Sequence, residues 1–315
     1  MKKSPILAAF AVAAALSCAG PAQAQQLRLM TGPQGGVWVP LGGALKNMWE
    51  KAIPGLSVQT LPGAGIANVR GIDEGKADIG FGNSISSVDG INGVAPYPKK
   101  VTKVCQLANL YPQYFQMVAL AGAGIGGVAD MKGRTVAVQP RGNTAEAITQ
   151  HMLRAVGMSY SDVKVSFVNS YTDAASMLKD GHAQVFTLGT TIPASSVMDV
   201  AAGRDIQLLP VNDQIVAAMK QINAGYTKGV IKAGTYPKQD KDVDAIVYSA
   251  HLVVSCDLPA ETVYTMAKTM VANLPDMVAI NKGMEGLTPQ AMAADIGVPF
   301  HPGAAKYYRE VGAMR

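Results

Sequence analysis

The sequence predicts an α/β fold of two lobes, each a mainly parallel sheet flanked by helices, with hinge strands joining the lobes. Apolar strand-like segments alternate with amphipathic helical segments, which is typical of parallel sheets covered on both faces. Two apolar segments, 104–121 and 245–255, are long enough to run from one lobe into the other. An arrangement of strand, glycine-containing turn and helix also occurs in both halves of the chain.

A short internal similarity supports two lobes of related topology. The sequence GKADI at 75–79 has a counterpart, GHAQV at 181–185, 106 positions further on. In both places a short helix is expected to end at glycine and a strand to begin. We therefore assign residues 25–115 and 245–315 to lobe 1, and residues 116–244 to lobe 2.

The first 24 residues have the pattern of a secretory signal peptide. Lys2 and Lys3 precede an apolar run at 6–16, and AQA at 22–24 is an A-x-A cleavage site. The apolar run is too short to span a membrane, which needs about 20 apolar residues. The pattern predicts cleavage after Ala24 and export to the periplasm. Lipidation of Cys18 is the alternative, but the sequence before it is a poor lipidation context.

The charge and length of the exported chain exclude two classes of protein. The net charge of +5 falls to +3 without the two leader lysines, and the exported chain has no block of Lys and Arg residues. A nucleic-acid track is therefore not indicated. No later segment has the length and apolar character of a membrane span, so we expect a protein that is not inserted in the membrane. We also expect it to be a monomer. The remaining length is ample for a sizeable core.

The first segment after the leader predicts an anion site. LRLMTGPQGGVWVP at 27–40 is a strand and a glycine-rich turn, and an amphipathic helix follows at 41–53. Free N–H groups of the turn then lie at the positive end of the helix dipole, and Trp38 offers a flat apolar surface. A tight turn that binds nothing is the alternative. The turn lacks the Gly-Lys-Ser/Thr ending of a phosphate loop, so a nucleotide is not expected.

Candidate ligand-binding residues lie where predicted strands end. Ligands of open α/β sheets bind outside the carboxyl ends of the strands. The strand ends at 31–36, 62–68 and 82–84 are expected to line one crevice. From these ends the candidates are Thr31, Gln34, Gly35, Gly36, Trp38, Ala64, Asn68, Asn83 and Ser84.

A second turn, at 139–144, repeats the design of the first and adds a positive charge. Asn143 or Thr144 is a natural helix N-cap, and Arg141 lies in the turn itself. We expect Arg141 to be the main charged partner of a carboxylate, because its planar guanidinium can form two parallel hydrogen bonds. A turn arginine that points to solvent is the alternative. The candidate set is completed by Gly142, Thr190, Tyr111 and Tyr226.

Several other patterns do not indicate chemistry. GAGIGG at 122–127 matches a dinucleotide fingerprint, but no helix follows it and no acidic residue stands about 20 residues on, so we interpret it as a surface loop. The four histidines are far apart, and there is no G-x-S-x-G motif. We expect no catalytic set, metal or cofactor. Cys105 and Cys256 either pair or remain buried thiols.

Six motifs together resemble the TAXI family of TRAP-transporter solute-binding proteins. They are TGPQGGVWVPLG, ADIGFGNS, LANLYPQYFQMVAL, DMKGRTVAVQPRGN, AGTYPKQDKDV and HPGAAKYYREVG, in this order along nearly the whole exported chain. The family commonly has T-G-S-x-G-G-x-Y-Y-P at the first motif. Thr31, Gly32, Gly35, Gly36 and Pro40 match this pattern, and Pro33, Val37, Trp38 and Val39 depart from it. The second turn, QPRGNT, departs from the family's G-P-P-G-S-G-type turn.

The resemblance implies a type II periplasmic-binding fold and a transport function. Its two lobes would close on a small organic anion, either a carboxylate or a glutamate-like amino acid, and deliver it to a TRAP membrane permease. One alternative is an exported enzyme that acts on a small carboxylate in the same cleft. Another is a surface protein that binds no solute.

The leader pattern gives a direct prediction about the exported protein. Cleavage at the A-x-A site should leave Gln25 as the first residue. N-terminal sequencing of the secreted form should therefore begin QQLRL. A protein that starts at a lipidated Cys18 would contradict it.

Overall fold

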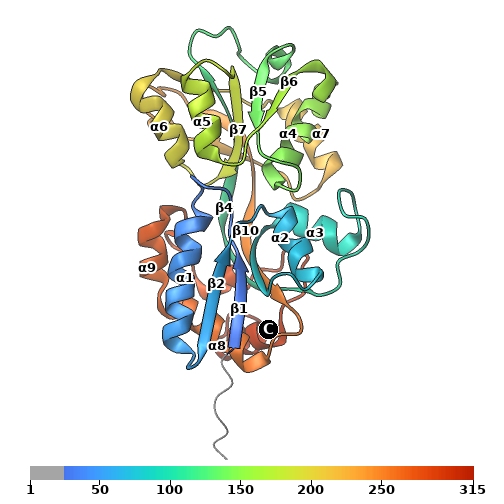
Figure 1. Cartoon of the computed structure of the whole chain (residues 1–315), viewed down its shortest axis with the longest axis vertical. Coiled ribbons are helices and arrows are strands. Elements are labelled where there is room, and N and C mark those ends of the chain that lie inside the picture. The colour runs from blue at the N-terminus through green and yellow to red at the C-terminus, as the bar shows by residue number, and fades with distance from the viewer. Residues whose placement is uncertain (1–24) are drawn as a thin grey trace, which may run out of the picture.

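The computed structural model describes residues 25–315, and the predicted signal peptide lies outside the described residues. The chain forms two α/β lobes stacked along the long axis of the molecule, with two long strands running between them (Figure 1). The predicted fold class is therefore confirmed. The residue ranges that we assigned to the lobes remain a prediction. Within residues 25–315, no helix is both long enough and apolar enough to cross a bilayer.

Lobe 1 is built on three parallel strands: β1 (Gln25–Met30), β2 (Leu56–Leu61) and β3 (Ile79–Asn83). β1 lies between the other two. The helices that follow them are α1 (Trp38–Ala52), α2 (Ile66–Asp73) and α3 (Ser84–Asn92). The C-terminal segment adds α8 (Ala260–Ala272), α9 (Leu274–Ile280), α10 (Pro289–Met292) and α11 (Pro302–Glu310), with a 3-10 turn at Lys282–Met284.

The helices of lobe 1 cover both faces of its sheet. Figure 1 shows α1 and α9 on one side and α2 and α3 on the other. The inner face of α1, with Leu41, Leu45 and Trp49, is fully buried against the strands and the C-terminal helices. Ile66 and Val69 of α2 pack in a separate cluster on the opposite face. The two-sided cover buries every residue of strand β3, whereas β1 and β2 alternate between buried and more exposed residues.

Lobe 2 repeats the plan with β5 (Thr135–Val138), β6 (Lys164–Phe167) and β7 (Val185–Thr190), which are parallel in the order β7-β5-β6. Its helices are α4 (Thr144–Ala155), α5 (Tyr171–Lys179), α6 (Ser195–Gly203) and α7 (Asp213–Ile222), with 3-10 turns at Val128–Met131 and Tyr160–Asp162. Residues 122–127 form a loop, as expected. Asp130 accepts hydrogen bonds from the N–H groups of Gly126 and Gly127 in this loop.

Two long strands connect the lobes, β4 (Val104–Leu120) and β10 (Val243–Ser255). They pair antiparallel with each other and make one continuous sheet in the order β2-β1-β3-β10-β4-β7-β5-β6. Pro112 lies inside β4 and does not interrupt it. The pairing of β4 with β7 begins only at Tyr114, so β4 has a free edge near Pro112 that tolerates a residue without an N–H group.

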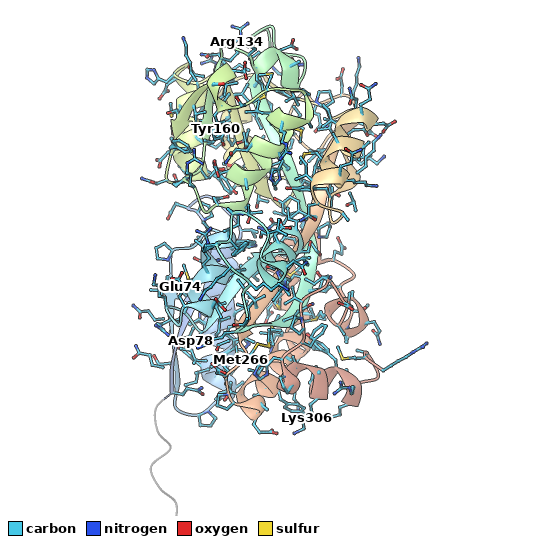
Figure 2. The ribbon with its side chains drawn as sticks, turned by 90° about the vertical axis from the view of Figure 1, so that its right-hand side faces the viewer. Glu74, Asp78, Arg134, Tyr160, Met266 and Lys306 are labelled. Carbon is cyan, nitrogen blue, oxygen red and sulfur yellow. A yellow bond between two sulfur atoms is a disulfide. The ribbon has the colours of Figure 1, made fainter. Side chains whose placement is uncertain are left out.

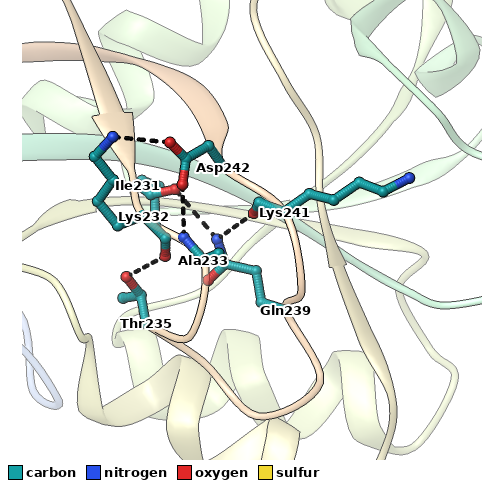
Figure 3. A network of polar contacts seen from close by, with 7 residues as sticks. All are labelled: Ile231, Lys232, Ala233, Thr235, Gln239, Lys241 and Asp242. Carbon is teal, nitrogen blue, oxygen red and sulfur yellow. Dashed lines mark hydrogen bonds and ion pairs between the residues drawn. The ribbon is translucent and has the colours of Figure 1, made fainter.

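The segment before β10 is more regular than its sequence suggests. β9 (Thr227–Ile231) pairs with β10, and β8 (Ile206–Leu208) pairs with β4. In the loop between β9 and β10, Asp242 accepts hydrogen bonds from Lys232 and from the N–H of Ala233, and Gln239 donates to two carbonyl oxygens (Figure 3). This network holds the loop that carries Tyr236. The buried Tyr236 hydroxyl accepts a hydrogen bond from the N–H of Ala194 just before α6.

The structure decides between the two alternatives for the cysteines. Cys105 and Cys256 form a disulfide, with their Cα atoms 5.1 Å apart. Cys105 lies at the start of β4 and Cys256 directly follows β10, so the disulfide ties the lobe 1 ends of both connecting strands.

Removal of this disulfide should destabilise the protein. It closes a loop with a sequence separation of 151 residues, and loss of a native disulfide typically costs about 2–5 kcal/mol. The Cys105→Ser/Cys256→Ser variant should unfold at a lower urea concentration than the wild type. Reductant should lower the wild-type midpoint and leave that of the variant unchanged. A wild-type midpoint that does not respond to reductant would show that the disulfide does not contribute.

Candidate functional site

A small cavity lies between the two lobes. Its volume is about 20 Å³. Its walls come from the turn before α1, the ends of strands in both lobes, the start of α4 and the two connecting strands. The lining residues are Pro33, Gly36, Val37, Trp38, Ala64, Gly65, Asn83, Gln113, Asn143, Thr144, Ala145, Tyr171, Gly189, Thr190 and Tyr248.

Four helices begin at this cavity. The N-cap residues of α1, α2, α3 and α4 are Val37, Gly65, Asn83 and Asn143, and all four line it. Only α4 is capped by a side chain, because Asn143 Oδ1 accepts a hydrogen bond from the N–H of Ala145 at 2.8 Å. The first turns of α1, α2 and α3 have no side-chain cap. The positive ends of the dipoles of all four helices therefore lie at the cavity.

Three side chains in the wall have buried polar atoms without a hydrogen-bond partner. These atoms are Trp38 Nε1, Asn83 Oδ1 and Gln113 Oε1, and each side chain is more than nine-tenths buried. The Trp38 ring stacks on Phe81 with centroids 5.2 Å apart, which fixes the direction of its N–H group. Buried polar groups are normally paired. The Tyr111 hydroxyl, which also lacks a hydrogen-bond partner, lies beside the Trp38 and Gln113 side chains.

The wall contains no ionisable group apart from two tyrosines. Among the described residues that line the cavity, none is Asp, Glu, Lys, Arg, His or Cys. Burial raises the pKa of Tyr171 to about 12, and it also raises the pKa of Tyr248. Both phenols are therefore neutral at physiological pH. The electrostatic field in the cavity comes from helix ends and neutral hydrogen-bonding groups.

Hydrogen bonds between the lobes enclose the cavity. The N–H of Tyr171 in lobe 2 donates to the carbonyl of Gln34 in lobe 1 at 3.0 Å. On the other side, the N–H of Ala67 donates to the carbonyl of Gly142 at 3.0 Å. The hydroxyls of Ser86 and Thr144 are 3.2 Å apart. The structure thus has the closed arrangement of the lobes.

Gly65 allows this close approach. Its φ angle is +55°, and a Cβ atom at this position would lie 2.2 Å from Thr144 Oγ1 in the opposite lobe. A larger residue would be strained in its backbone and would also push the lobes apart. The glycine therefore serves contact between the lobes as well as the turn.

The structure brings together seven of the candidate residues predicted from the sequence. Those that line the cavity are Gly36, Trp38, Ala64, Asn83, Asn143, Thr144 and Thr190. They come from both predicted turns, from the turn after β2 and from the ends of strands β3 and β7. The three strand ends that we expected to line one crevice, at 31–36, 62–68 and 82–84, each contribute a lining residue.

Other candidates lie close by and contact the scaffold. Thr31 Oγ1 donates to the carbonyl of Leu61, and Asn68 is buried among strand ends. Gln34 and Gly35 lie on an outer groove beside the cavity. Ser84 and Tyr111 line a separate hollow along the connecting strands.

Three candidates lie outside the cavity, either in the turn before α4 or further along lobe 2. Arg141 is exposed, and its guanidinium carbon lies 5.9 Å from the centroid of the Phe167 ring. Arg141 and Gly142 line a groove outside the cavity. The hydroxyl of Tyr226 is buried and lies 2.9 Å from His151 Nδ1. The geometry therefore does not carry our expectation that Arg141 contacts a ligand in the cavity.

Sequence reasoning missed eight lining residues: Pro33, Val37, Gly65, Gln113, Ala145, Tyr171, Gly189 and Tyr248. Pro33, Val37 and Gly65 lie in turns that were identified, next to residues that were chosen. Gln113 and Tyr248 lie in the connecting strands. Their period-two alternation could have indicated a shared face, but it does not say which face points to the cavity.

Comparisons with known proteins agree with this architecture. A match to the NMT1-like family spans residues 29–312. A structure described as a periplasmic transporter is 12% identical, with a TM-score of 0.55 and 93% of each chain covered. The alkanesulfonate-binding protein SsuA from Xanthomonas axonopodis pv. citri, bound to MOPS, is 14% identical, with a TM-score of 0.52, and the match covers 91% of this chain and 84% of that protein.

A third similar structure is an ancestral arginine-binding protein bound to arginine. It is 14% identical with a TM-score of 0.50, and the match covers 82% of this chain and 97% of that protein. At such identities these structures establish a shared fold only. That fold is the α/β architecture of periplasmic binding proteins.

A buried serine and histidine pair lies outside the cavity. His251 on β10 is fully buried, and its Nε2 is 2.8 Å from Ser87 Oγ on α3. Burial lowers the pKa of His251 from the ordinary 6.5 to about 3. The imidazole is therefore neutral and packed in lobe 1.

This histidine should make stability depend on pH. Below pH 6.5 the unfolded chain binds a proton at His251 that the folded protein does not bind until about pH 3. The neutral ring therefore makes its full contribution to the free energy of unfolding above pH 6.5. As pH decreases below 6.5, this contribution falls by about 1.4 kcal/mol per pH unit. The His251→Gln variant should show a shallower fall between pH 6.5 and 4 in urea titrations. Identical slopes for variant and wild type would contradict the pKa shift.

Proposed function

The chain belongs to the NMT1-like family, and on that premise we propose that it is a periplasmic solute-binding receptor. It captures a small organic anion, a carboxylate or a glutamate-like amino acid, in the cavity between its lobes. The observation that carries this proposal is the set of three uncapped helix starts around a closed cavity that also holds unpartnered polar side chains. Such an arrangement suits a negatively charged group.

Neutral groups would hold the anion. Each helix start contributes about 0.3–1 kcal/mol to binding of an anion when exposed and up to about 2 kcal/mol when partly buried. The N–H of Trp38 adds a fixed hydrogen-bond donor. A cation would meet positive helix ends here and no carboxylate, so the cavity disfavours it. We do not assign the exposed Arg141 to this contact.

The remaining acceptors favour a ligand that also has a donor group. Asn83 Oδ1 and Gln113 Oε1 are buried without partners, and both side chains line the cavity. A hydroxyl or ammonium group beside the carboxylate would satisfy them, as in a hydroxy acid or an amino acid. The cavity volume in this closed arrangement is about 20 Å³, far below the range of small-molecule sites, about 300–1,000 Å³. The lobes must therefore separate to admit a solute, and the closed form of the cavity favours a small one.

Capture without chemical change is supported by the composition of the wall. Acid–base catalysis needs a carboxylate, imidazole, lysine, thiol or phenol near its ordinary titration range. The described lining residues offer only two phenols whose pKa is raised by burial. We infer that the solute leaves unaltered, delivered to a membrane permease. The motifs that resemble TAXI proteins favour a permease of the TRAP type.

Lobe movement would give the solute access. The cavity is enclosed by hydrogen bonds between the lobes, so entry requires them to separate. β4 and β10 are the connections that can bend. Hinge closure around a ligand is a common response of two-lobed binding proteins.

Two matched variants test how the anion is held. A thermal-shift screen of small carboxylates, hydroxy acids and amino acids, with neutral sugars for comparison, would supply the ligand. Trp38→Phe keeps the ring and removes the N–H, and it should weaken binding at least tenfold, since a hydrogen bond to a charged group contributes about 1.5–3 kcal/mol. Arg141→Gln should stay within about twofold of wild type in calorimetry.

The opposite pattern would overturn the proposed contact. If Arg141→Gln lost affinity and Trp38→Phe did not, the anion would have to lie outside the cavity. If sugars alone shifted the melting temperature, the proposed ligand class would be wrong.

A further inference from the structure

A second feature shared by the two lobes is a groove beside the cavity, which we call the arginine groove. Ile66 and Arg70 of α2 and the loop at 95–96 line it from lobe 1. From lobe 2 it is lined by the turn at 141–142, one face of α4 and residues 158–160. Figure 2 labels Tyr160 on this wall, between Arg134 at the distal end of lobe 2 and Glu74 in lobe 1.

Three guanidinium groups give the groove a positive charge. Arg70 donates to the carbonyl of Pro96 and lies 5.4 Å from the centroid of Tyr97, while Arg141 and Arg154 are exposed. In the part of the chain that the structure describes, none of the three forms an ion pair with a carboxylate. By contrast, Arg28 pairs with Asp78 at 2.9 Å.

The one carboxylate in the described wall of the groove is already engaged. Glu146 is buried, and its Oε1 accepts hydrogen bonds from Gln150 Nε2 at 2.7 Å and from the Tyr160 hydroxyl at 3.0 Å. It therefore does not pair with the arginines. The charge of the groove is available to a partner from outside the chain.

The groove depends on closure of the lobes. Arg70 belongs to lobe 1, and Arg141 and Arg154 belong to lobe 2. The hydrogen bond from Ala67 to Gly142 joins the two walls next to these residues. Separation of the lobes would break this bond and move Arg70 away from the other two arginines. A ligand that contacts all three would thus recognise the closed form.

We propose that the arginine groove docks an acidic peptide segment of the membrane partner that receives the solute. Arginine forms paired hydrogen bonds with carboxylates, and a peptide with several acidic residues can reach cations on both walls. The groove is open, and two of its arginines are exposed. An extended peptide could lie along such a surface, whereas a single small ion would not be enclosed by it. The inference rests on the proposed function for the identity of the partner.

Coupling to solute then follows from linkage. If solute and peptide both favour closed lobes, each raises the affinity for the other by the same factor. The partner would in this way select the loaded receptor. Mutual strengthening needs no contact between the two ligands.

A fluorescein-labelled hexaglutamate peptide tests the surface directly. Anisotropy titrations with the whole mature protein should show binding that weakens between about 20 mM and about 300 mM salt, since screening reduces interactions of exposed charges. Arg141→Glu/Arg154→Glu should weaken binding at least tenfold. The control Arg134→Glu/Lys164→Glu changes the net charge equally at two exposed positions of lobe 2 outside the groove, and it should stay within about threefold of wild type.

The other results would overturn the proposal. No binding by wild type, or an equal loss in both variants, would mean that the groove does not select acidic peptides. Full displacement by inorganic phosphate at matched charge would make the groove a site for a small anion. The peptide titration needs no solute, and a normal thermal shift with solute in both variants would separate failure of this surface from failure of solute binding.

Discussion

The side chain of Asn68 determines the geometry on which the cavity depends. Its Nδ2 donates to the carbonyl oxygens of Thr31 at 2.7 Å and Phe81 at 2.8 Å, and its Oδ1 accepts from the N–H of Ala64 at 2.9 Å. One buried amide thus fixes the ends of β1 and β3 and the turn before α2. Three helix starts are positioned by these segments. Gly63 leaves room for this contact, since a Cβ there would lie 2.2 Å from Asn68 Oδ1.

Much of the fold could be predicted because the spacing of apolar residues along the sequence reflects which side chains are buried. The alternation of strands and helices, the two long strands and the loop at 122–127 were all read correctly from the sequence. α3 was missed, because SISSVDGIN has little apolar periodicity and the helix owes its place to contacts with β10 and Asn223. The position of Pro112 inside β4 has a different explanation. Proline is disfavoured inside a strand, but β4 has a free edge at this point, and the sequence does not show which edges of a strand are paired.

The site was predictable only in part. Glycine-rich turns before helices carry a local signal, and both predicted turns supply cavity residues. Gln113 and Tyr171 have no such signal, because they reach the cavity through the twist of the sheet and the approach of the lobes. The direction of a charged side chain could not be predicted from the sequence. Arg141 is in the predicted turn, and its guanidinium lies over the ring of Phe167 and lines the groove outside the cavity.

The disulfide has a consequence for the direction of motion. Cys105 and Cys256 join β4 and β10 at their lobe 1 ends, so these strands cannot slide along each other there. Sliding of one strand past the other is therefore blocked. The motions still open to this two-stranded ribbon are bending and twisting, with the disulfide holding one end. The register shifts at Ala250/His251 and Leu252/Val253 lie just inside this anchor. The lobes can therefore swing or rotate about the ribbon, but neither can translate past the other along the strand direction.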